Sequence, residues 1–461
     1  MNRFWKLAIA NILSNLMVPL ASLFDVAFLG HLDNIRYLAG VSLATILFNY
    51  IYWTFGFLRM GTTGITAQAN GRKDTDEVLA IGLRHLGIAL TLGVIIWLLQ
   101  IPLRELGFTL LSATPAVKAA GKAYYNANIW GAPATLMNFV LIGWFLGREQ
   151  SRKVLLISAI GNGANVALNY GLIVRLGWAS TGAGVATAAS QYITFMVGMA
   201  MILHEKPWET VSLSFGSKLR DRAALKAIFS LNGNILIRTF ALVSTFAAFT
   251  NISSAIATLT LVTNTLLLQV VSFSAYFIDG LAFATESLAG NFYASGDSKQ
   301  LRHLIVLSGK VSLALGLGFA ILFISFPELL FGLLTDRVEV IQNIKNYTFW
   351  LLPVLGFGAI AYMLDGYFLG IAAGSILRNS SLWATGVGFV PVAVFAWLQQ
   401  SPHLLWLALT CFMVGRVVAL GSAVVISHQS SVISHQFFGQ SVMGNRQLLE
   451  DEEGEETTNN Q

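Results

Sequence analysis

Long apolar runs dominate the chain and recur from near its start almost to its end. A helix needs about 20 consecutive apolar residues to cross the hydrocarbon core of a bilayer. Twelve runs of roughly this length or longer alternate with short polar turns, at residues 7–30, 38–69, 79–101, 119–147, 154–174, 181–203, 225–250, 256–289, 303–325, 339–371, 376–398 and 403–426. The pattern predicts an all-α polytopic membrane protein with twelve transmembrane helices.

The last six runs resemble the first six. In the fourth run of each half the offset is 223, and six positions match, namely Tyr124, Leu141, Gly143, Phe145, Leu146 and Gly147. In the second run the offset is 219, and three positions match, namely Gly61, Thr66 and Gly71. Isolated glycine matches are also expected wherever membrane helices pack through small residues. Six matches in one frame favour an internal duplication.

An even number of spans in each half gives the two copies the same orientation, which is typical of transporters built from parallel repeats that rock about a central site. We therefore expect two six-helix lobes around a central cleft. The predicted boundaries are an N-terminal lobe at 1–203, an inter-lobe linker at 204–222 and a C-terminal lobe at 223–426. The acidic segment 427–461 is predicted to be a disordered tail.

Composition and charge agree with a membrane protein and indicate its orientation. The chain is 55% hydrophobic and 11% charged, whereas soluble domains carry about 25% charged residues. If the N-terminus is inside, 18 of the 28 lysines and arginines fall in inner segments. This positive-inside bias predicts a multi-pass protein of the cell membrane with both termini in the cytoplasm. The net charge of +5 reflects this topology and does not indicate nucleic-acid binding.

Ionisable residues inside the predicted spans are the first candidates for function, because a charge at that depth costs about 3 kcal/mol on insertion scales. Seven occur: Asp25, Arg59, Arg238, Asp279, Glu286, Asp365 and Arg416. If each of the three arginines pairs with one acid, a single carboxylate remains to cycle protons or a metal cation. By position alone, Asp25 and Glu286 are equally compatible with a functional acid and with a helix end near the headgroups.

Three further residues gain interest from their spacing. Pro19 lies mid-helix, six residues before Asp25, where it removes a backbone hydrogen bond and can act as a hinge. Asn165 and Asn169 are four apart and share a helix face. Their amides either line a cation site or join neighbouring helices, and spacing alone favours helix packing.

Motifs for other chemistry are missing from the sequence. It contains no G-x-x-x-x-G-K-[ST] loop, no complete G-x-G-x-x-G, no D-D-x-x-D and no His/Cys cluster with metal-ligand spacing. Cys411 is the single cysteine, so an intrachain disulfide is impossible. We expect no enzymatic activity, no cofactor and no resident metal site.

These residues resemble the DinF-like branch of the multidrug and toxic compound extrusion (MATE) transporters. The resemblance extends over about residues 5–425 and is carried by Pro19 with Asp25 and Gly30-His31-Leu32, Phe57-Leu58-Arg59-Met60, Thr66-Ala67-Gln68-Ala69, Trp144-Phe145-Leu146-Gly147, Asn162 with Asn165, Asn232 with Arg238, Tyr276 with Asp279-Gly280, and Leu364-Asp365-Gly366. It implies two lobes that export small organic, cationic or amphiphilic compounds in exchange for protons or sodium.

The resemblance also implies which residues bind the coupling cation and the substrate. The matching positions of a first-lobe cation site are Asp25, Asn165, Asn169 and Thr187, with Pro19 as the hinge. The family pattern usually has aspartate where this chain has Asn169, so proton coupling is favoured over sodium coupling. A second-lobe polar cluster and substrate cleft is expected from Asn232, Arg238, Tyr276, Asp279, Glu286 and Asp365. We expect a monomer in the lipid bilayer that binds small molecules.

Two other classes of function remain as alternatives. A lipid or lipid-precursor flippase, or a passive channel, can share a two-lobed apolar cleft. A flippase for pyrophosphate-linked lipids should line that cleft with several cations, whereas here three basic residues accompany four acids within the membrane. A membrane scaffold without transport activity would not retain buried charges.

Overall fold

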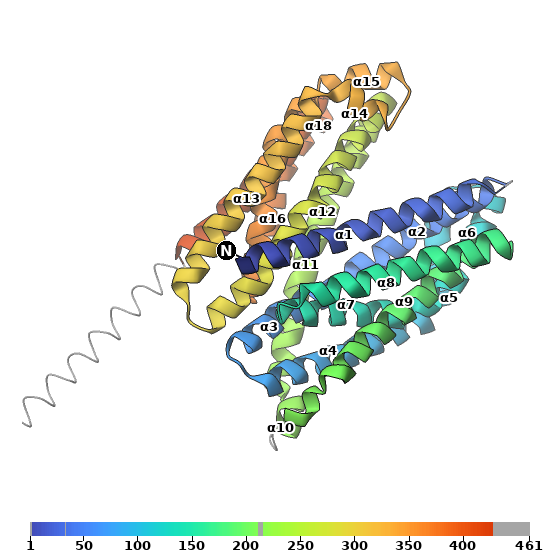
Figure 1. Ribbon diagram of the computed structural model, residues 1–461. Coiled ribbons are helices and arrows are strands. Elements are labelled where there is room, and N and C mark those ends of the chain that lie inside the picture. Colours follow the sequence, from blue (N-terminus) through green and yellow to red (C-terminus); the bar gives the residue numbers. More distant parts are fainter. Residues whose placement is uncertain (1, 33, 211–214, 427–461) are drawn as a thin grey trace, which may run out of the picture.

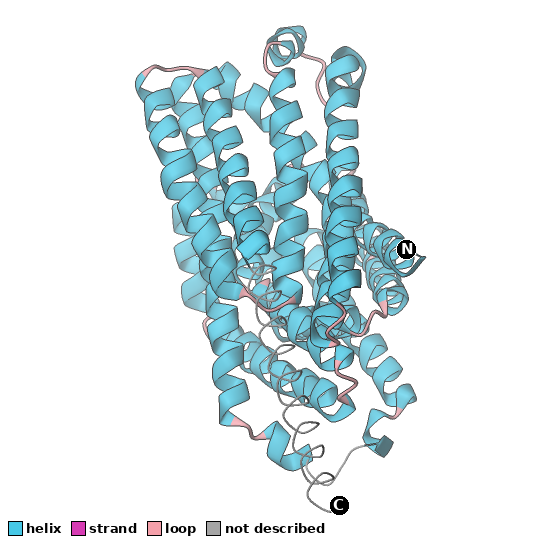
Figure 2. Cartoon of the chain, turned by 90° about the vertical axis from the view of Figure 1, so that its left-hand side faces the viewer, coloured by secondary structure: helices cyan, strands magenta, loops and turns pink. Residues whose placement is uncertain are grey.

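The computed structural model describes residues 2–32, 34–210 and 215–426. Within these ranges the chain is helical with short loops, and no strand occurs (Figure 2). The predicted tail at 427–461 lies outside the described residues.

The first lobe is formed by α1 to α9. Its helices are α1 (Asn2–Gly30), α2 (Arg36–Thr54), α3 (Phe57–Gly71), α4 (Thr75–Leu98), α5 (Gln100–Leu110), α6 (Pro115–Asn128), η1 (Ile129–Gly131), α7 (Ala132–Gly147), α8 (Ser151–Asn169), the π-helical η2 (Tyr170–Arg175) and α9 (Ala179–Glu205). Two short helices, η3 (Pro207–Thr210) and α10 (Phe215–Leu219), occupy the linker.

The second lobe begins at α11. Its helices are α11 (Arg222–Ile256), α12 (Thr258–Ala294), α13 (Ser298–Ser325), α14 (Pro327–Gly332), α15 (Val338–Lys345), η4 (Thr348–Trp350), α16 (Leu351–Gly370), α17 (Gly374–Trp383), the π-helical η5 (Ala384–Phe389), α18 (Val390–Leu398) and a last helix, Pro402–Ile426.

Among the described residues, eleven helical segments are long and apolar enough to cross a membrane. The segment that falls short is α8 with η2, which packs against α1 and α9. Its polar residues lower its mean hydropathy, although it lies side by side with α1 and α9. With this segment included, the structure has the twelve predicted spans.

Several predicted runs are interrupted in the structure. The second breaks at Phe55–Gly56, between α2 and α3, and the fourth breaks at η1, where Pro133 starts a new helix. Proline fits the first turn of a helix because its missing N–H has no partner there. The tenth span begins at Thr348 rather than at residue 339, because α15 is a separate short helix.

Turn geometry gives independent support for the internal duplication. Residues with left-handed backbone (positive φ) recur in pairs 223 positions apart, namely Lys73 with Gly296, Glu149 with Ala372, and Gly177 with Gln400. The helix-ending hydrogen bonds recur with them: Gln150 N–H donates to Phe145 O, and Ala373 N–H donates to Phe368 O. Both halves therefore place a left-handed residue just after their second, fourth and fifth spans.

This register corrects one alignment made from the sequence. The turns after the second spans match at an offset of 223, so the glycine and threonine matches at 219 are one helical turn out of register. The repeat counterparts of Asp279 and Glu286 are consequently Gly56 and Thr63. Small residues are frequent enough in membrane helices to match in the wrong frame.

Paired glycines bring the second and fourth spans of each lobe together. A Cβ added at Gly143 would lie 2.5 Å from Arg59 O, and one at Gly147 would lie 2.7 Å from Thr63 O. Their repeat partners Gly366 and Gly370 are equally close to carbonyl oxygens of α12. The four-residue spacing permits backbone-to-backbone packing, as in small-xxx-small seams.

The two lobes meet at one face of the molecule and diverge towards the other (Figure 1). We call the first the N-terminal face, where α1 begins and α3, α7, α12 and α16 end, and the other the far face. The helix α1 belongs to both lobes: Gly280 of α12 packs on Ile12, whereas the second half of α1 contacts α8. Side chains of α1, including Phe4 and Leu7, join a hydrophobic cluster made mainly of second-lobe residues.

Candidate transport site

Polar side chains from α1, α8 and α9 form a connected network in the far-face half of the first lobe. The Asn169 amide Nδ2 donates to Asp25 Oδ1 at 2.5 Å and to Asn165 Oδ1 at 3.1 Å. Asn165 Nδ2 lies 3.5 Å from Thr187 Oγ1, and Thr187 in turn donates to the carbonyl of Ala183. The structure thus brings together all four residues expected at the first-lobe site.

Asp25 differs from the other intramembrane acids in its partners. Its carboxylate accepts a hydrogen bond from a neutral amide and takes part in no ion pair within the described residues. Tyr124 of α6 is buried and lies close enough to Asp25 to interact with its charge, and it also interacts with Thr187. The helix α1 continues through Pro19 without a break. A proton on Asp25 would therefore change the charge of a site that no arginine neutralises.

In the second lobe, two arginines share one carboxylate. Arg238 of α11 and Arg416 of the last helix both donate to Asp365 Oδ2. Arg416 is fully buried and lies 5.2 Å from the ring centre of Tyr362. Loss of the negative charge on Asp365 would leave two buried arginines without a partner, so Asp365 is suited to fixing the helices rather than to exchanging protons.

A third ion pair joins the two lobes. Arg59 of α3 lies 3.5 Å from Glu286 of α12 and stacks on the Phe283 ring. Glu286 has no exposed side-chain area, so its position is buried between the lobes and not a helix end facing headgroups. Asp279 makes no ion pair within the described residues, although it lies in the electrostatic field of the nearby arginines.

These contacts change the expected pairing of charges. One-to-one pairing of three arginines would leave one acid over. Because two arginines converge on Asp365, two acids, Asp25 and Asp279, lack a direct ion pair among the described residues.

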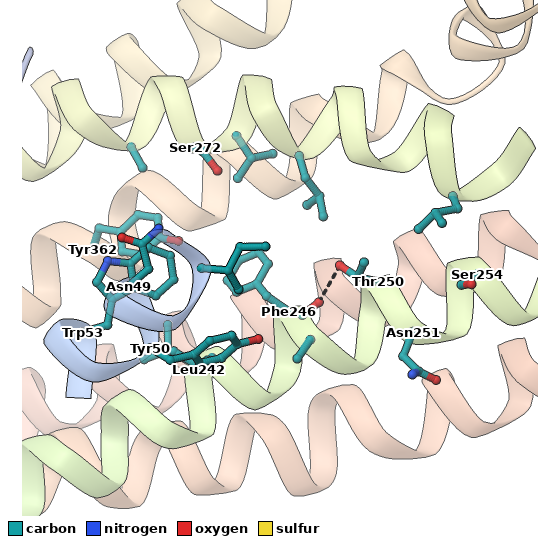
Figure 3. Close-up of a pocket in the computed structure, with 17 residues that line it drawn as sticks. Asn49, Tyr50, Trp53, Leu242, Phe246, Thr250, Asn251, Ser254, Ser272 and Tyr362 are labelled. Carbon is teal, nitrogen blue, oxygen red and sulfur yellow. Dashed lines mark hydrogen bonds between the residues drawn. The ribbon is translucent and has the colours of Figure 1, made fainter. Parts of the chain in front are cut away.

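A cavity of about 920 Å³ lies between the lobes in the far-face half (Figure 3). The first lobe contributes Asn49, Tyr50 and Trp53 of α2, while α11 and α12 form the two long walls. Among the described residues, the lining contains aromatic, aliphatic, hydroxyl and amide side chains and no charged one. Such a lining suits an amphiphilic organic molecule.

Arg238, Asp279 and Asp365 lie about one helical turn from the lining residues at the end of the cavity nearer the N-terminal face, which we call the cavity floor. On α11, Arg238 precedes the lining residue Leu242 by four residues, and on α12, Asp279 follows the lining residue Ala275 by four. On α16, Asp365 follows the lining residue Tyr362 by three. One helical turn is about 5.4 Å, so all three charges lie below the floor at similar depth.

The other expected second-lobe residues occupy different places. Asn232 is buried against α3, where a Cβ on Gly61 would lie 2.2 Å from its Oδ1. Tyr276 accepts a hydrogen bond at its carbonyl from Asn15 of α1. Together with Arg238, Asp279, Glu286 and Asp365, these residues surround the cavity floor and the lobe interface, and none of the six lines the cavity itself. Their functional role stays a prediction.

On the N-terminal face the lobes are closed by direct polar contacts. Asn70 Nδ2 donates to Asn291 Oδ1 at 2.6 Å, and Ser287 donates to the carbonyl of Leu146 at 2.5 Å. Asn291 also donates to Gly147 O. The cavity and these contacts together describe a conformation that is open towards the far face and closed at the N-terminal face.

The linker helix α10 is attached to the first lobe at the same face. Lys218 Nζ lies 2.7 and 2.9 Å from the two carboxylate oxygens of Asp74, and Arg84 donates to the carbonyl of Lys218. Burial would raise the pKa of Asp74, but the hydrogen bond and charge of Lys218 outweigh it and hold the pKa below its usual value. The contact is therefore an ion pair at neutral pH.

Comparison with known proteins identifies the family. The MatE family profile matches residues 10–171 and 234–398. This chain belongs to the MatE family. DNA damage-inducible protein F of Escherichia coli strain K12 is 32% identical to this MatE protein, over 91% of the chain and 90% of the relative. Protein DETOXIFICATION 44, chloroplastic, of Arabidopsis thaliana is 27% identical over 87% of the chain and 78% of the relative.

A solved structure has the same fold. It is described as the outward-facing conformation of a multidrug resistance MATE family transporter of the MOP superfamily. It superposes on this MatE protein with a TM-score of 0.82 at 19% identity, and the match covers 93% of this chain and 95% of the other. The resemblance to DinF-like MATE transporters that the sequence predicted is thus confirmed.

Sequence reasoning passed over several residues of this MatE protein. Arg416 was counted as an intramembrane charge, but its contact with Asp365 has no sequence signal because the two residues are on different helices. The sequence marks Tyr124 only through its repeat match with Tyr347. The α2 residues Asn49 and Tyr50 lie in an apolar run, and a helical-wheel comparison with Trp53 could have placed all three on one face.

Proposed function

We propose that this MatE protein is a secondary active antiporter that exports organic, cationic or amphiphilic compounds in exchange for protons by alternating access. The observation that carries the proposal is the contrast between Asp25 and Asp365. Asp365 is held by two arginines, whereas Asp25 is held by a neutral amide. Only the latter arrangement leaves a carboxylate whose charge can change at modest cost during a cycle.

Coupling requires that proton and cargo favour different conformations. Protonation of Asp25 from the far face removes the negative charge to which Asn169 donates, and the network to Asn165 and Thr187 must rearrange. Pro19 lies between this site and the half of α1 that packs on the second lobe. A change at Asp25 is thereby connected to the wall of the cavity through α1.

Sodium is the competing coupling ion. Oxygen atoms of Asp25, Asn165, Asn169 and Thr187 could face a cation, and Asn169 Oδ1 is buried without a partner among the described residues. However, Asn165 Oδ1 already accepts from Asn169, and the site holds a single carboxylate. Protons are therefore favoured.

The N-terminal face is assigned to the cytoplasm because the sequence places most basic residues on that side. The cavity then opens to the outside, where cargo is released. Its lining without cations gives no support to transport of pyrophosphate-linked lipids. We further propose that the protein acts as a monomer, since each lobe supplies one part of the cavity.

The test is transport in proteoliposomes of defined orientation, with Asp25→Asn against wild type and Ser22→Ala as the control. Ser22 lies on the same helix, and among the described residues its hydroxyl donates to the carbonyl of Val18 on that helix. A pH difference should drive ethidium movement in wild type and Ser22→Ala, and Asp25→Asn should abolish it. A sodium gradient at equal pH should drive none. Full transport by Asp25→Asn with an unchanged pH dependence would refute the proposal.

A further inference from the structure

Two hydrogen bonds fix the register between α1 and α8 along the length of the first lobe. Ser14 Oγ and Ser158 Oγ are 2.7 Å apart, and Asn169 donates to Asp25 at 2.5 Å. Both pairs are separated by 144 positions in sequence. The helices therefore run parallel and in step from one pair to the other.

This register defines a continuous line of facing positions, which we call the α1–α8 seam. By this register it consists of Asn11, Ser14, Val18, Ala21 and Asp25 on α1, and of Leu155, Ser158, Asn162, Asn165 and Asn169 on α8. Val18, opposite Asn162, is 54% exposed, so α1 does not close the middle of the seam. The spacing alternates between three and four residues, as in the facing seam of a coiled coil. Such positions are normally apolar. Here α8 places four polar side chains in succession at them.

The seam has polar groups at both ends and at its middle. Asn162 Nδ2 donates to the Ser158 carbonyl, which leaves its side-chain oxygen available. Asn11 is 1% exposed, and both atoms of its amide lack a partner among the described residues. A buried amide without partners costs about 1–3 kcal/mol in proteins. Asn169 Oδ1, at the other end of the seam, is also buried without a partner among the described residues. Unpaired polar atoms at both ends of one line inside a membrane call for a function.

The ends of the seam indicate what that function is. Asp25 lies at the far-face end, and Arg3 of α1 pairs with Glu149 at 2.5 Å at the N-terminal face, just before α8. Ser14 and Asp25 are eleven residues apart, or about 16 Å along the helix axis. Pro19 lies between them and leaves the carbonyl of Asn15 without its helical N–H donor. The seam thus runs from the titratable acid to Asn11, which is eight residues, or about 12 Å, from Arg3 at the opposite face.

We propose that the α1–α8 seam is the path by which the coupling proton leaves Asp25 for the N-terminal face. The proposal rests on the proton-coupled function given above. Protonated Asp25 gives up its O–H proton and becomes a carboxylate, and the proton is accepted by water in the seam. The hydroxyls of Ser14 and Ser158 can accept one proton and donate another. The amides of Asn11, Asn162 and Asn165 hold water by hydrogen bonds without carrying the proton.

The test removes polarity from the seam while leaving Asp25 and the cavity intact. Proteoliposomes containing ethidium and a trapped pH-sensitive dye receive an acid pulse on the far-face side. In the double variant Ser14→Ala with Ser158→Ala, and in Asn162→Val, proton entry coupled to ethidium export should fall at least about tenfold. Ethidium affinity and its dependence on pH should stay at wild-type values, because Asp25 still titrates.

Two matched variants separate a proton path from a structural role. Ser22→Ala removes a hydroxyl from α1 closer to Asp25 but off the seam, and it should transport normally. Asn162→Ser keeps a polar group at the same position and should restore most of the rate lost in Asn162→Val. A seam that only packs helices would tolerate valine as well as serine, and equal rates for these two variants would overturn the proposal.

The remaining outcomes distinguish this inference from the proposed function. If wild type shows no proton entry coupled to ethidium export, the proton-coupled function fails and the path fails with it. If wild type shows coupled entry and the double serine variant and Asn162→Val retain it in full, only the path is overturned. Loss of ethidium binding in the variants would place their effect on the cavity and would likewise overturn the path.

Discussion

Closure of the N-terminal face depends on the absence of a side chain at Gly64. This residue of α3 faces the backbone of α16 in the other lobe, and an added Cβ would lie 2.1 Å from Leu369 O. Real Cβ atoms do not approach within 3.0 Å, so Gly64→Ala must separate the backbones locally by at least 0.9 Å. A backbone carbonyl cannot move aside as a flexible side chain can.

The cost of this separation sets the size of the effect. Overpacking by one methyl group costs about 1–3 kcal/mol, and the contact between Gly64 and Leu369 exists only where the two lobes meet. Alanine also favours the helix more than glycine, but it does so equally in both conformations. The far-face-open conformation should therefore lose population relative to the opposite one by about 5- to 150-fold.

The assay is a distance measurement across the far face. Leu110 in the first lobe and Leu333 in the second are highly exposed, and replacement of Cys411, the single cysteine, leaves a background in which both can be changed to cysteine and spin-labelled. Gly64→Ala should shift the distance distribution towards shorter values. The control is Gly87→Ala on α4, where an added Cβ meets nothing within 4 Å. An unchanged distribution for Gly64→Ala would refute the reasoning.

Two further predictions concern contacts at the same face. Glu286→Leu leaves Arg59 buried without its partner and should destabilise the protein by about 3–5 kcal/mol. Adding Arg59→Met should recover most of this loss, which thermal unfolding in detergent can measure. A double variant no more stable than Glu286→Leu would contradict this prediction. Because the pKa of Asp74 is lowered, the stability from its pair with Lys218 is fully present above the ordinary pKa of a free aspartate and is lost only as pH falls through the lowered value. The backbone amides of residues 215–219 should then be equally protected from hydrogen exchange at pH 8 and pH 5, after correction for the intrinsic exchange rate. Asp74→Asn should weaken that protection at both pH values. A loss of protection in wild type between pH 8 and pH 5 would show that the ion pair does not hold α10.

The spans and the repeat could be predicted from the sequence because a helix that crosses the lipid needs a long run of apolar residues. Apolar runs mark every span, including α8, in which Asn162 and Asn165 lower the hydropathy. The register between the repeats was harder, since glycines match by chance in small-residue seams. It became certain only through the left-handed residues Lys73 and Gly296, whose conformation has no clear sequence signal at a lysine.

The first-lobe site was accessible for a different reason. Asn165 and Asn169 lie on one helix, so their spacing places them on one face. Asp25 stands out as an acid within an apolar span, and the family resemblance supplied Thr187. Charge pairing in the second lobe was not accessible. Whether Asp365 takes one arginine or two depends on how α11, α16 and the last helix pack, and composition carries no information on that arrangement.

The energetics of the N-terminal face suit a gate that opens in every cycle. Removing one partner from a buried ion pair is costly, but separating the lobes hydrates Arg59 and Glu286 together, and a buried pair is close to energetic balance with its solvated parts. The neutral bonds between Asn70 and Asn291 are similarly replaced by bonds to water at a net cost of about 1 kcal/mol each. In the proposed proton-coupled cycle, one proton moving down a pH difference of one unit and 100 mV supplies about 3.7 kcal/mol. A closure stabilised much beyond that amount would trap the transporter, so weak polar contacts and close glycine packing are better suited to this interface than a large hydrophobic core.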